Sequence, residues 1–101
     1  MKINMQSVNF NADQKLVNFT NQKLSKLESH FSKIISANVF MKVDNGSTKE
    51  NKVTEILLGI PGGELVVKKT YKTFEEGVDQ CVAGLERQLS KRKEKQKINL
   101  V

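Results

Sequence analysis

The spacing of apolar residues changes three times along the chain, and the order of these changes restricts the fold more than any single motif does. Residues 2–10 alternate between polar and apolar, which is the period of a strand with one covered face. A helical period follows over residues 11–35, alternation returns over 38–72, and residues 74–96 are helical again. The predicted order of elements is therefore β-α-β-β-β-α.

The first helical segment carries a start signal and an amphipathic stripe. Asn11 precedes Gln14 by three residues, an arrangement that satisfies free amide groups at a helix start. The apolar side of the segment consists of Leu16, Val17, Thr20, Leu24, Leu27, Phe31, Ile34 and Ile35. This side is expected to pack on a sheet.

Three strands are predicted after this helix, over residues 38–44, 53–61 and 64–72. Asn45-Gly46 is a strong hairpin signal, although the polar residues after it suggest a longer loop. Pro61-Gly62-Gly63 closes the second turn. Tight connections of this kind favour an antiparallel meander.

The last helix is predicted to extend past the core. Thr73 and Glu76 form a second capping box at its start. Its apolar positions are Phe74, Val78, Val82, Leu85 and Leu89, with Cys81 beside them as a small buried side chain. Helical composition continues after Leu89 without further apolar positions, so the final turns should project beyond the sheet.

These elements predict one α+β domain over residues 1–101, with two helices on one face of a four-stranded sheet. The first two strands are joined through a helix and can lie parallel with a right-handed crossover, whereas the later strands are antiparallel.

The net charge of +6 is concentrated near the end of the last helix. Between residues 87 and 97 only Glu94 opposes Arg87, Lys91, Arg92, Lys93, Lys95 and Lys97. At 100° per residue, Arg87, Lys91 and Lys95 share one exposed flank. On the first helix, Lys23 and Lys26 flank the apolar stripe and are expected to extend the same surface. Such a surface attracts a polyanion, and structured RNA fits it better than a membrane does.

Three other interpretations remain open at this point. A Lys-rich helix end can be a solvated face that complements the helix dipole. The basic helix or the open sheet face could bind an acidic protein. An enzyme acting on a small anion is disfavoured, because His30 is the only histidine and the acidic residues are dispersed.

No catalytic residues, cofactor or metal site are predicted. The single Cys81 excludes an internal disulfide, and Gly62-Gly63 lacks the following helix and lysine of a phosphate loop. The first ten residues are not a signal peptide and no stretch is long enough to span a membrane, so a cytoplasmic protein is expected.

Four segments resemble the ribosome hibernation-promoting factor family, also called the ribosome-associated inhibitor or protein Y family. They are MKINMQSVNF, NQKLSKLESHF, PGGELVV and, above all, GLERQLSKRKEKQK. The last of these is the most specific, because an amphipathic helix would accept any polar residues at its exposed positions.

The resemblance implies a fold similar to double-stranded-RNA-binding domains and binding in the decoding channel of the small ribosomal subunit. Steric overlap with messenger and transfer RNA would then repress translation in stress or stationary phase. The family's RNA-binding residues match Lys23, Lys26, Arg87, Lys91, Arg92, Lys93 and Lys95. The implied partner is the small subunit with its ribosomal RNA, bound by a protein that is monomeric off the ribosome and has no small-molecule substrate and no membrane partner. The alternative is a module that binds structured RNA in general or an acidic protein.

The chain also departs from the family pattern. Many members open the last helix with an Asp-Met-Tyr-type segment, whereas Thr73-Phe74-Glu75 stands here. The cap and the apolar anchor are kept, but a tyrosine that could face RNA is lost. The chain ends at Val101 and resembles the short form, without the C-terminal dimerisation domain of longer members.

Overall fold

Six elements follow one another in the predicted order. The computed structural model describes residues 1–44, 46 and 51–99, with residues 94–99 described by their backbone alone. The elements are β1 (Lys2–Val8), α1 (Gln14–His30), β2 (Ser36–Val43), β3 (Lys52–Ile60), β4 (Gly63–Tyr71) and α2 (Phe74–Asn99). Most boundaries agree with the predicted ranges to within a few residues.

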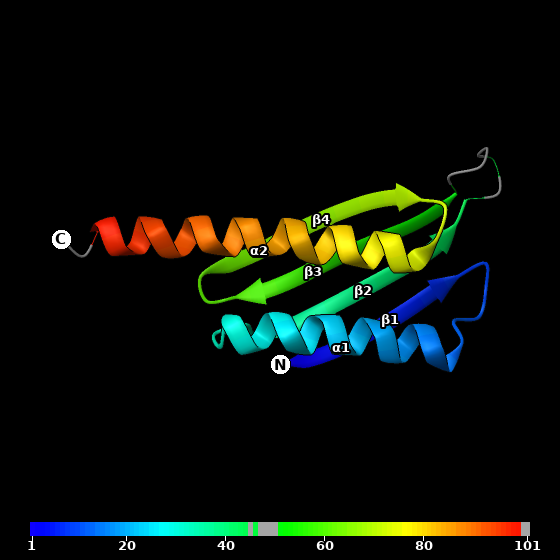
Figure 1. Ribbon diagram of the computed structural model, residues 1–101, viewed down its shortest axis with the longest axis horizontal. Coiled ribbons are helices and arrows are strands. Elements are labelled where there is room, and N and C mark those ends of the chain that lie inside the picture. Colours follow the sequence, from blue (N-terminus) through cyan, green and yellow to red (C-terminus); the bar gives the residue numbers. More distant parts are fainter. Residues whose placement is uncertain (45, 47–50, 100–101) are drawn as a thin grey trace.

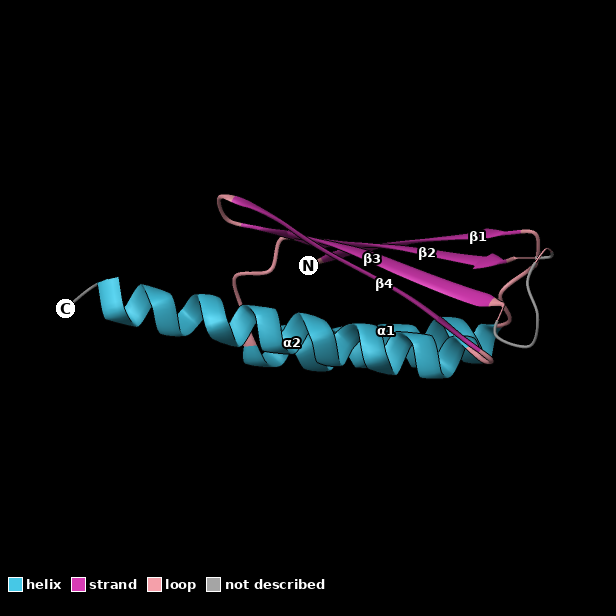
Figure 2. Ribbon diagram, turned by 90° about the horizontal axis from the view of Figure 1, so that it is seen from above, coloured by secondary structure: helices cyan, strands magenta, loops and turns pink. Residues whose placement is uncertain are grey.

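The four strands form one sheet in the order β1-β2-β3-β4. β1 is parallel to β2, and the remaining neighbours are antiparallel, as predicted. Both helices cover the same face of this sheet and leave the other face open (Figures 1 and 2). The fold is therefore two-layered, with its core between the sheet and the helices.

The core is built from rows of side chains that cross the sheet. Met5, Val39, Ile56 and Val67 are aligned across the four strands and belong to or pack against the core. Leu24 of α1 and Val78 and Leu85 of α2 are fully buried above the sheet. Burial of a side chain of this size stabilises the fold by about 1.5–3 kcal/mol, so these contacts hold both helices in place.

β1 ends two residues earlier than predicted. Asn9 adopts a φ of 68°, in the left-handed region where a strand cannot continue. Its side-chain amide donates a hydrogen bond to the carbonyl oxygen of Val43 at 3.3 Å, which fixes the turn toward α1.

Both ends of α1 differ from the predicted ends. Asp13, not Asn11, is the N-cap, and its Oδ1 accepts a hydrogen bond from the Leu16 amide at 2.8 Å. The helix ends at His30 although the helical spacing continues to Ile35. The Ile35 amide instead donates to the Gly59 carbonyl at 2.8 Å, and its side chain is 58% exposed. Pairing with the sheet has replaced the last helical turns, although Ile34 is still buried.

The loop between β2 and β3 is longer than a tight hairpin. The Asp44 amide donates to the Asn51 carbonyl at 2.9 Å, which closes a connection of several residues. Of the turn pair Asn45-Gly46, Asn45 lies outside the described residues.

α2 begins with the capping interaction between Thr73 and Glu76 that the sequence predicts. The Glu76 amide donates to Thr73 Oγ1 at 3.2 Å. Over the next two turns α2 lies close to β3: Gly77 faces the Thr54 side chain, and the Cys81 thiol donates to the Thr54 carbonyl oxygen at 3.5 Å. A larger residue than glycine would hold the helix away from the sheet.

Gly77→Ala is expected to lower the free energy of unfolding by about 1–2 kcal/mol. The added methyl group would lie 2.5 Å from Thr54 Oγ1, and this overlap outweighs the helix preference of alanine. Gly84→Ala is the matched control, because its methyl group would lie 3.5 Å from Val67 Cγ2, an ordinary contact. This change should be neutral or stabilising by up to about 1 kcal/mol. Chemical denaturation of both variants tests the difference, and equal stabilities would contradict it.

α2 runs on past the end of α1 and past the sheet (Figures 1 and 2). The molecule measures 50 Å along its longest axis and 24 Å along the next. Leu89 is the last buried residue of the helix, and Ser90 to Lys93 are exposed. The predicted projection of the final turns is confirmed.

Candidate nucleic-acid interface

The sides of α2 face two different neighbours. Gly84 lies toward β4, because a methyl group on it would meet Val67 Cγ2 at 3.5 Å and Arg87 Nη2 at 3.9 Å. Asp79 lies toward α1, where its Oδ1 is 2.8 Å from Lys23 Nζ. With Gly84 and Asp79 as reference points, the spacing of 100° per residue shows which neighbour each of the other charged residues of α2 faces.

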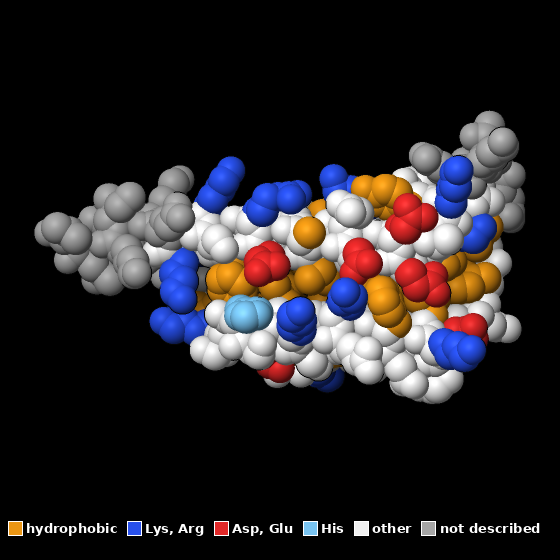
Figure 3. Space-filling view, viewed as in Figure 1, with side chains coloured by type: hydrophobic (Ala, Val, Ile, Leu, Met, Phe, Trp, Pro, Cys, Tyr) orange, Lys and Arg blue, Asp and Glu red, His pale blue; other side chains and the backbone are white. Residues whose placement is uncertain are grey.

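The side toward β4 is positively charged. Arg87 and Lys91 are exposed there, about one helical turn apart. Lys69 is exposed on β4 and projects from the same face of that strand as Val67, because side chains alternate along a strand. We call Lys69, Arg87 and Lys91 the basic flank. Figure 3 shows Lys and Arg side chains along the edge of α2 that faces away from α1.

The side toward α1 is negatively charged. Glu75, Asp79 and Glu86 lie within about 40° of one another around the helix. Figure 3 shows acidic side chains between the two helices. From Asp79 to Lys91 the two sides of α2 therefore carry opposite charges, although Glu76 is exposed on the β4 side in the first turn, and the basic flank is the side that attracts a polyanion.

The acidic side separates the lysines of α1 from the basic flank. Lys23 is paired with Asp79, and its Nζ also lies 5.4 Å from the centre of the Phe19 ring. Lys26 is exposed, about 60° from Lys23 around the helix. The expectation of one continuous surface over both helices is therefore wrong in this respect, because the charges between Lys23 and the basic flank are negative.

The remaining predicted residues lie on the projecting part of α2. Arg92 and Lys93 are exposed and line a pocket beneath it rather than the basic flank. Lys95 belongs to α2, but its side chain lies outside the described part of the chain. Sequence reasoning missed Lys33 in this pocket and Lys69 on the basic flank, since neither belongs to the helical charge pattern.

Two aromatic residues near the start of α2 stack on each other. The rings of Phe10 and Phe74 stack with centroids 4.5 Å apart and an angle of 13° between their planes. Phe74 is buried, which confirms it as the apolar anchor of this corner. The buried ring of Phe74 is therefore not available to stack on a nucleic-acid base.

Reactive groups do not gather in the described part of the structure. No three His, Cys, Asp or Glu side chains come together there as a metal site would require. Cys81 is buried, and desolvation raises the pKa of its thiol to about 11, against a smaller opposing effect of Lys69. This thiol is protonated at neutral pH and is not a nucleophile. None of the described helices could cross a bilayer, since each is too short or too polar.

Cys81 should make the protein less stable in alkali. The unfolded thiol loses its proton near pH 9, whereas the folded one keeps it until about pH 11. The free energy of the unfolded state therefore falls relative to that of the folded state as the pH rises between these values, and unfolding becomes easier by up to about 1.4 kcal/mol per pH unit. Denaturant titrations of wild type and Cys81→Ala from pH 8 to 11 test this, because the difference between the two pH profiles isolates the contribution of this thiol. Parallel pH profiles would contradict it.

The fold and the charge distribution define a small α+β binding protein suited to a polyanionic partner. The family model described as Sigma 54 modulation protein / S30EA ribosomal protein matches residues 3–97. The chain belongs to this family, which is also that of the ribosome hibernation promoting factors and consists of binding proteins rather than enzymes. The predicted family is thus confirmed.

Curated relatives match over nearly their whole length. The ribosome hibernation promoting factor of Pseudomonas putida strain KT2440 is 36% identical over 96 residues, covering 95% of this chain and 90% of that protein. That of Escherichia coli K12 is 29% identical over 97 residues, covering 96% and 98%.

Solved structures share the fold. A ribosomal subunit interface protein from Coxiella burnetii superposes with a TM-score of 0.83 at 21% identity, covering 93% of this chain and 99% of that one. The N-terminal domain of Thermus thermophilus Protein Y gives 0.76 at 22% identity, covering 90% and 98%. At these identities the likeness establishes the β-α-β-β-β-α fold.

Proposed function

We propose that this chain is a ribosome hibernation factor that binds ribosomal RNA in the decoding channel of the small subunit. Occupancy of that channel by a rigid protein excludes messenger and transfer RNA and represses translation in stress or stationary phase, without any chemical step. The family and the names of the curated relatives support this function. The protein acts in the cytoplasm as a monomer when it is off the ribosome.

The basic flank is the observation that carries the proposal. Arg87 and Lys91 are exposed on a helix that is anchored in the core up to Leu89. Cations on a rigid support can contact RNA phosphates without a large loss of side-chain and backbone entropy. Each contact releases counterions condensed on the RNA, which favours binding at low salt.

Sedimentation with purified small ribosomal subunits at rising salt tests the proposal. Affinity should fall with salt by roughly one logarithmic unit per logarithmic unit of salt for each phosphate contacted. The bound protein should also reduce the binding of messenger and transfer RNA to the same subunits. Binding that does not depend on salt would contradict phosphate recognition. Association with a protein that survives nuclease treatment and contains no ribosomal RNA would favour the acidic-partner alternative.

A further inference from the structure

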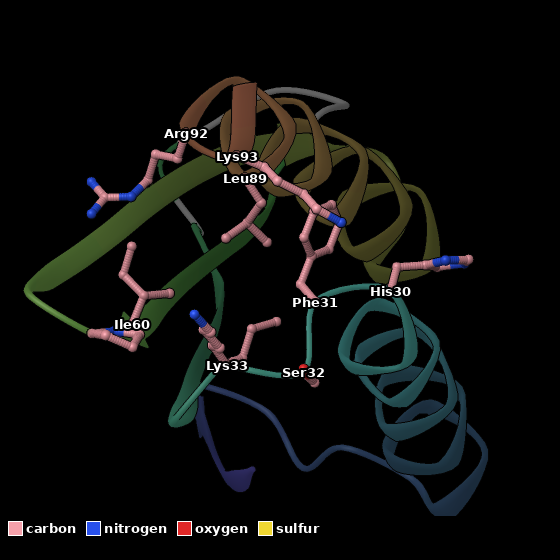
Figure 4. Close-up of a pocket in the computed structure, with 10 residues that line it drawn as sticks. His30, Phe31, Ser32, Lys33, Ile60, Leu89, Arg92 and Lys93 are labelled. Carbon is pink, nitrogen blue, oxygen red and sulfur yellow. The ribbon is translucent and has the colours of Figure 1, made fainter. Parts of the chain in front are cut away.

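A pocket of about 360 Å³ lies where α2 projects past the end of α1. It exists because α1 stops at His30 while α2 continues, and the turn after β3 forms its third side. Leu89 of α2 and Ile60 of β3 point toward each other across it (Figure 4). The core is therefore open to solvent at this end, because α1 is too short to cover it.

The lining combines an apolar floor with cations. Ile34, Ile60 and Leu89 form the floor and are the last largely buried side chains at this end of the core. Lys33, Arg92 and Lys93 surround it, and no Asp or Glu is among the described residues that line it. A ligand that fits this lining has a flat apolar part and a negative charge at its edge.

Phe31 supplies one wall of the pocket. It caps α1, packs on the core and is only half-buried, so that part of its ring is open. In Figure 4 Phe31 and Arg92 stand on opposite sides of the pocket, the amino group of Lys33 points inward and His30 points away. The aromatic wall and the amino group of Lys33 thus face the same space, whereas the guanidinium of Arg92 extends outward from the rim.

We propose that this pocket takes one unpaired nucleotide of a bound RNA, with the base against Phe31 and the floor, the phosphate beside Lys33, and Arg92 and Lys93 at the rim, where they can contact neighbouring phosphates of the same RNA. The volume is at the small end of ligand pockets, which suits a single nucleotide rather than a base pair. Stacking on an aromatic ring does not depend strongly on which base is present. The inference rests on the proposed function, because it adds an unpaired nucleotide to the phosphate contacts of the basic flank.

The test compares two fluorescently labelled RNAs by anisotropy: a continuous 16-base-pair duplex and the same duplex with one bulged adenosine. Wild type should bind the bulged RNA about tenfold more tightly, as one base–aromatic contact provides. Phe31→Leu and Lys33→Gln should each reduce this preference while still binding the continuous duplex. Lys15→Gln removes an exposed lysine at the far end of α1 and should keep the full preference.

The outcomes separate this proposal from the proposed function. Equal binding of the two RNAs by wild type, or a preference that persists in both pocket variants, would overturn the pocket. Failure of the ribosomal function would show instead as weak binding to small subunits, whatever the preference between the two RNAs. Thermal melts establish that Phe31→Leu is folded, and Lys33→Gln changes only an exposed side chain, so the test does not depend on one variant.

Discussion

Replacing both Arg87 and Lys91 with glutamate is expected to weaken binding to small ribosomal subunits at least about 100-fold. Each charge-assisted contact to a phosphate contributes about 1.5–3 kcal/mol, and reversal adds repulsion to the loss. The salt dependence should become shallower by about two logarithmic units per logarithmic unit of salt, one for each lost contact. Both side chains are exposed, so the free energy of unfolding should change by less than about 1 kcal/mol.

A matched control distinguishes a local interface from a general attraction of charge. Lys2 and Lys42 are exposed on the open face of the sheet, opposite the helices. Their replacement by glutamate lowers the net charge of the protein by the same amount. This control should retain nearly all of the affinity. Equal losses in the two double variants would mean that net charge, rather than the basic flank, determines binding.

The fold could be predicted from local patterns because each element depends on which of its faces is buried. The alternation in β1 and the stripe from Phe74 to Leu89 reflect contact with one core, and both elements lie where those patterns place them. The projection of α2 was predictable for the same reason, since the apolar positions end while helix-forming residues continue.

The ends of α1 could not be predicted from spacing alone. Asn11 and Asp13 are both suitable caps, and the choice depends on the turn that Asn9 makes after β1. Ile35 fits the helical stripe, but its amide donates a hydrogen bond to the carbonyl oxygen of Gly59 in β3. The early end of α1 creates the pocket, which is why Lys33 was not recognised as a candidate contact.

The arrangement of charges also required the tertiary structure. The sequence places Arg87 and Lys91 on one flank of a helix, but it does not say which neighbour each flank faces. The pairing of Lys23 with Asp79 shows that the α1 side of α2 is acidic and that the basic flank faces away from it. A phosphate backbone is therefore expected to follow the β4 side of α2, where Lys69 adds a third cation.

Leu85→Ala is expected to lower the stability of the protein but not its affinity for small subunits, which is the opposite of what is expected for the charge reversal at Arg87 and Lys91. Leu85 is fully buried between α2 and the sheet, and its truncation leaves a cavity that should lower the free energy of unfolding by about 2–5 kcal/mol. Val66→Ala, at a side chain 51% exposed on the open face, should change it by no more than about 0.5 kcal/mol. Denaturant unfolding of the two variants measures the difference.

The affinity of Leu85→Ala for small subunits should stay within about threefold of wild type at temperatures where the variant is folded. Binding by the basic flank requires only that α2 stays in its folded position. While most molecules are folded, the apparent affinity is reduced only by the small fraction that is unfolded. Loss of stability without loss of binding here, and the reverse in the Arg87 and Lys91 double variant, would separate the residues that hold α2 from those that contact RNA. A large loss of affinity in folded Leu85→Ala would mean that the interface depends on the packing of α2 as much as on its charge.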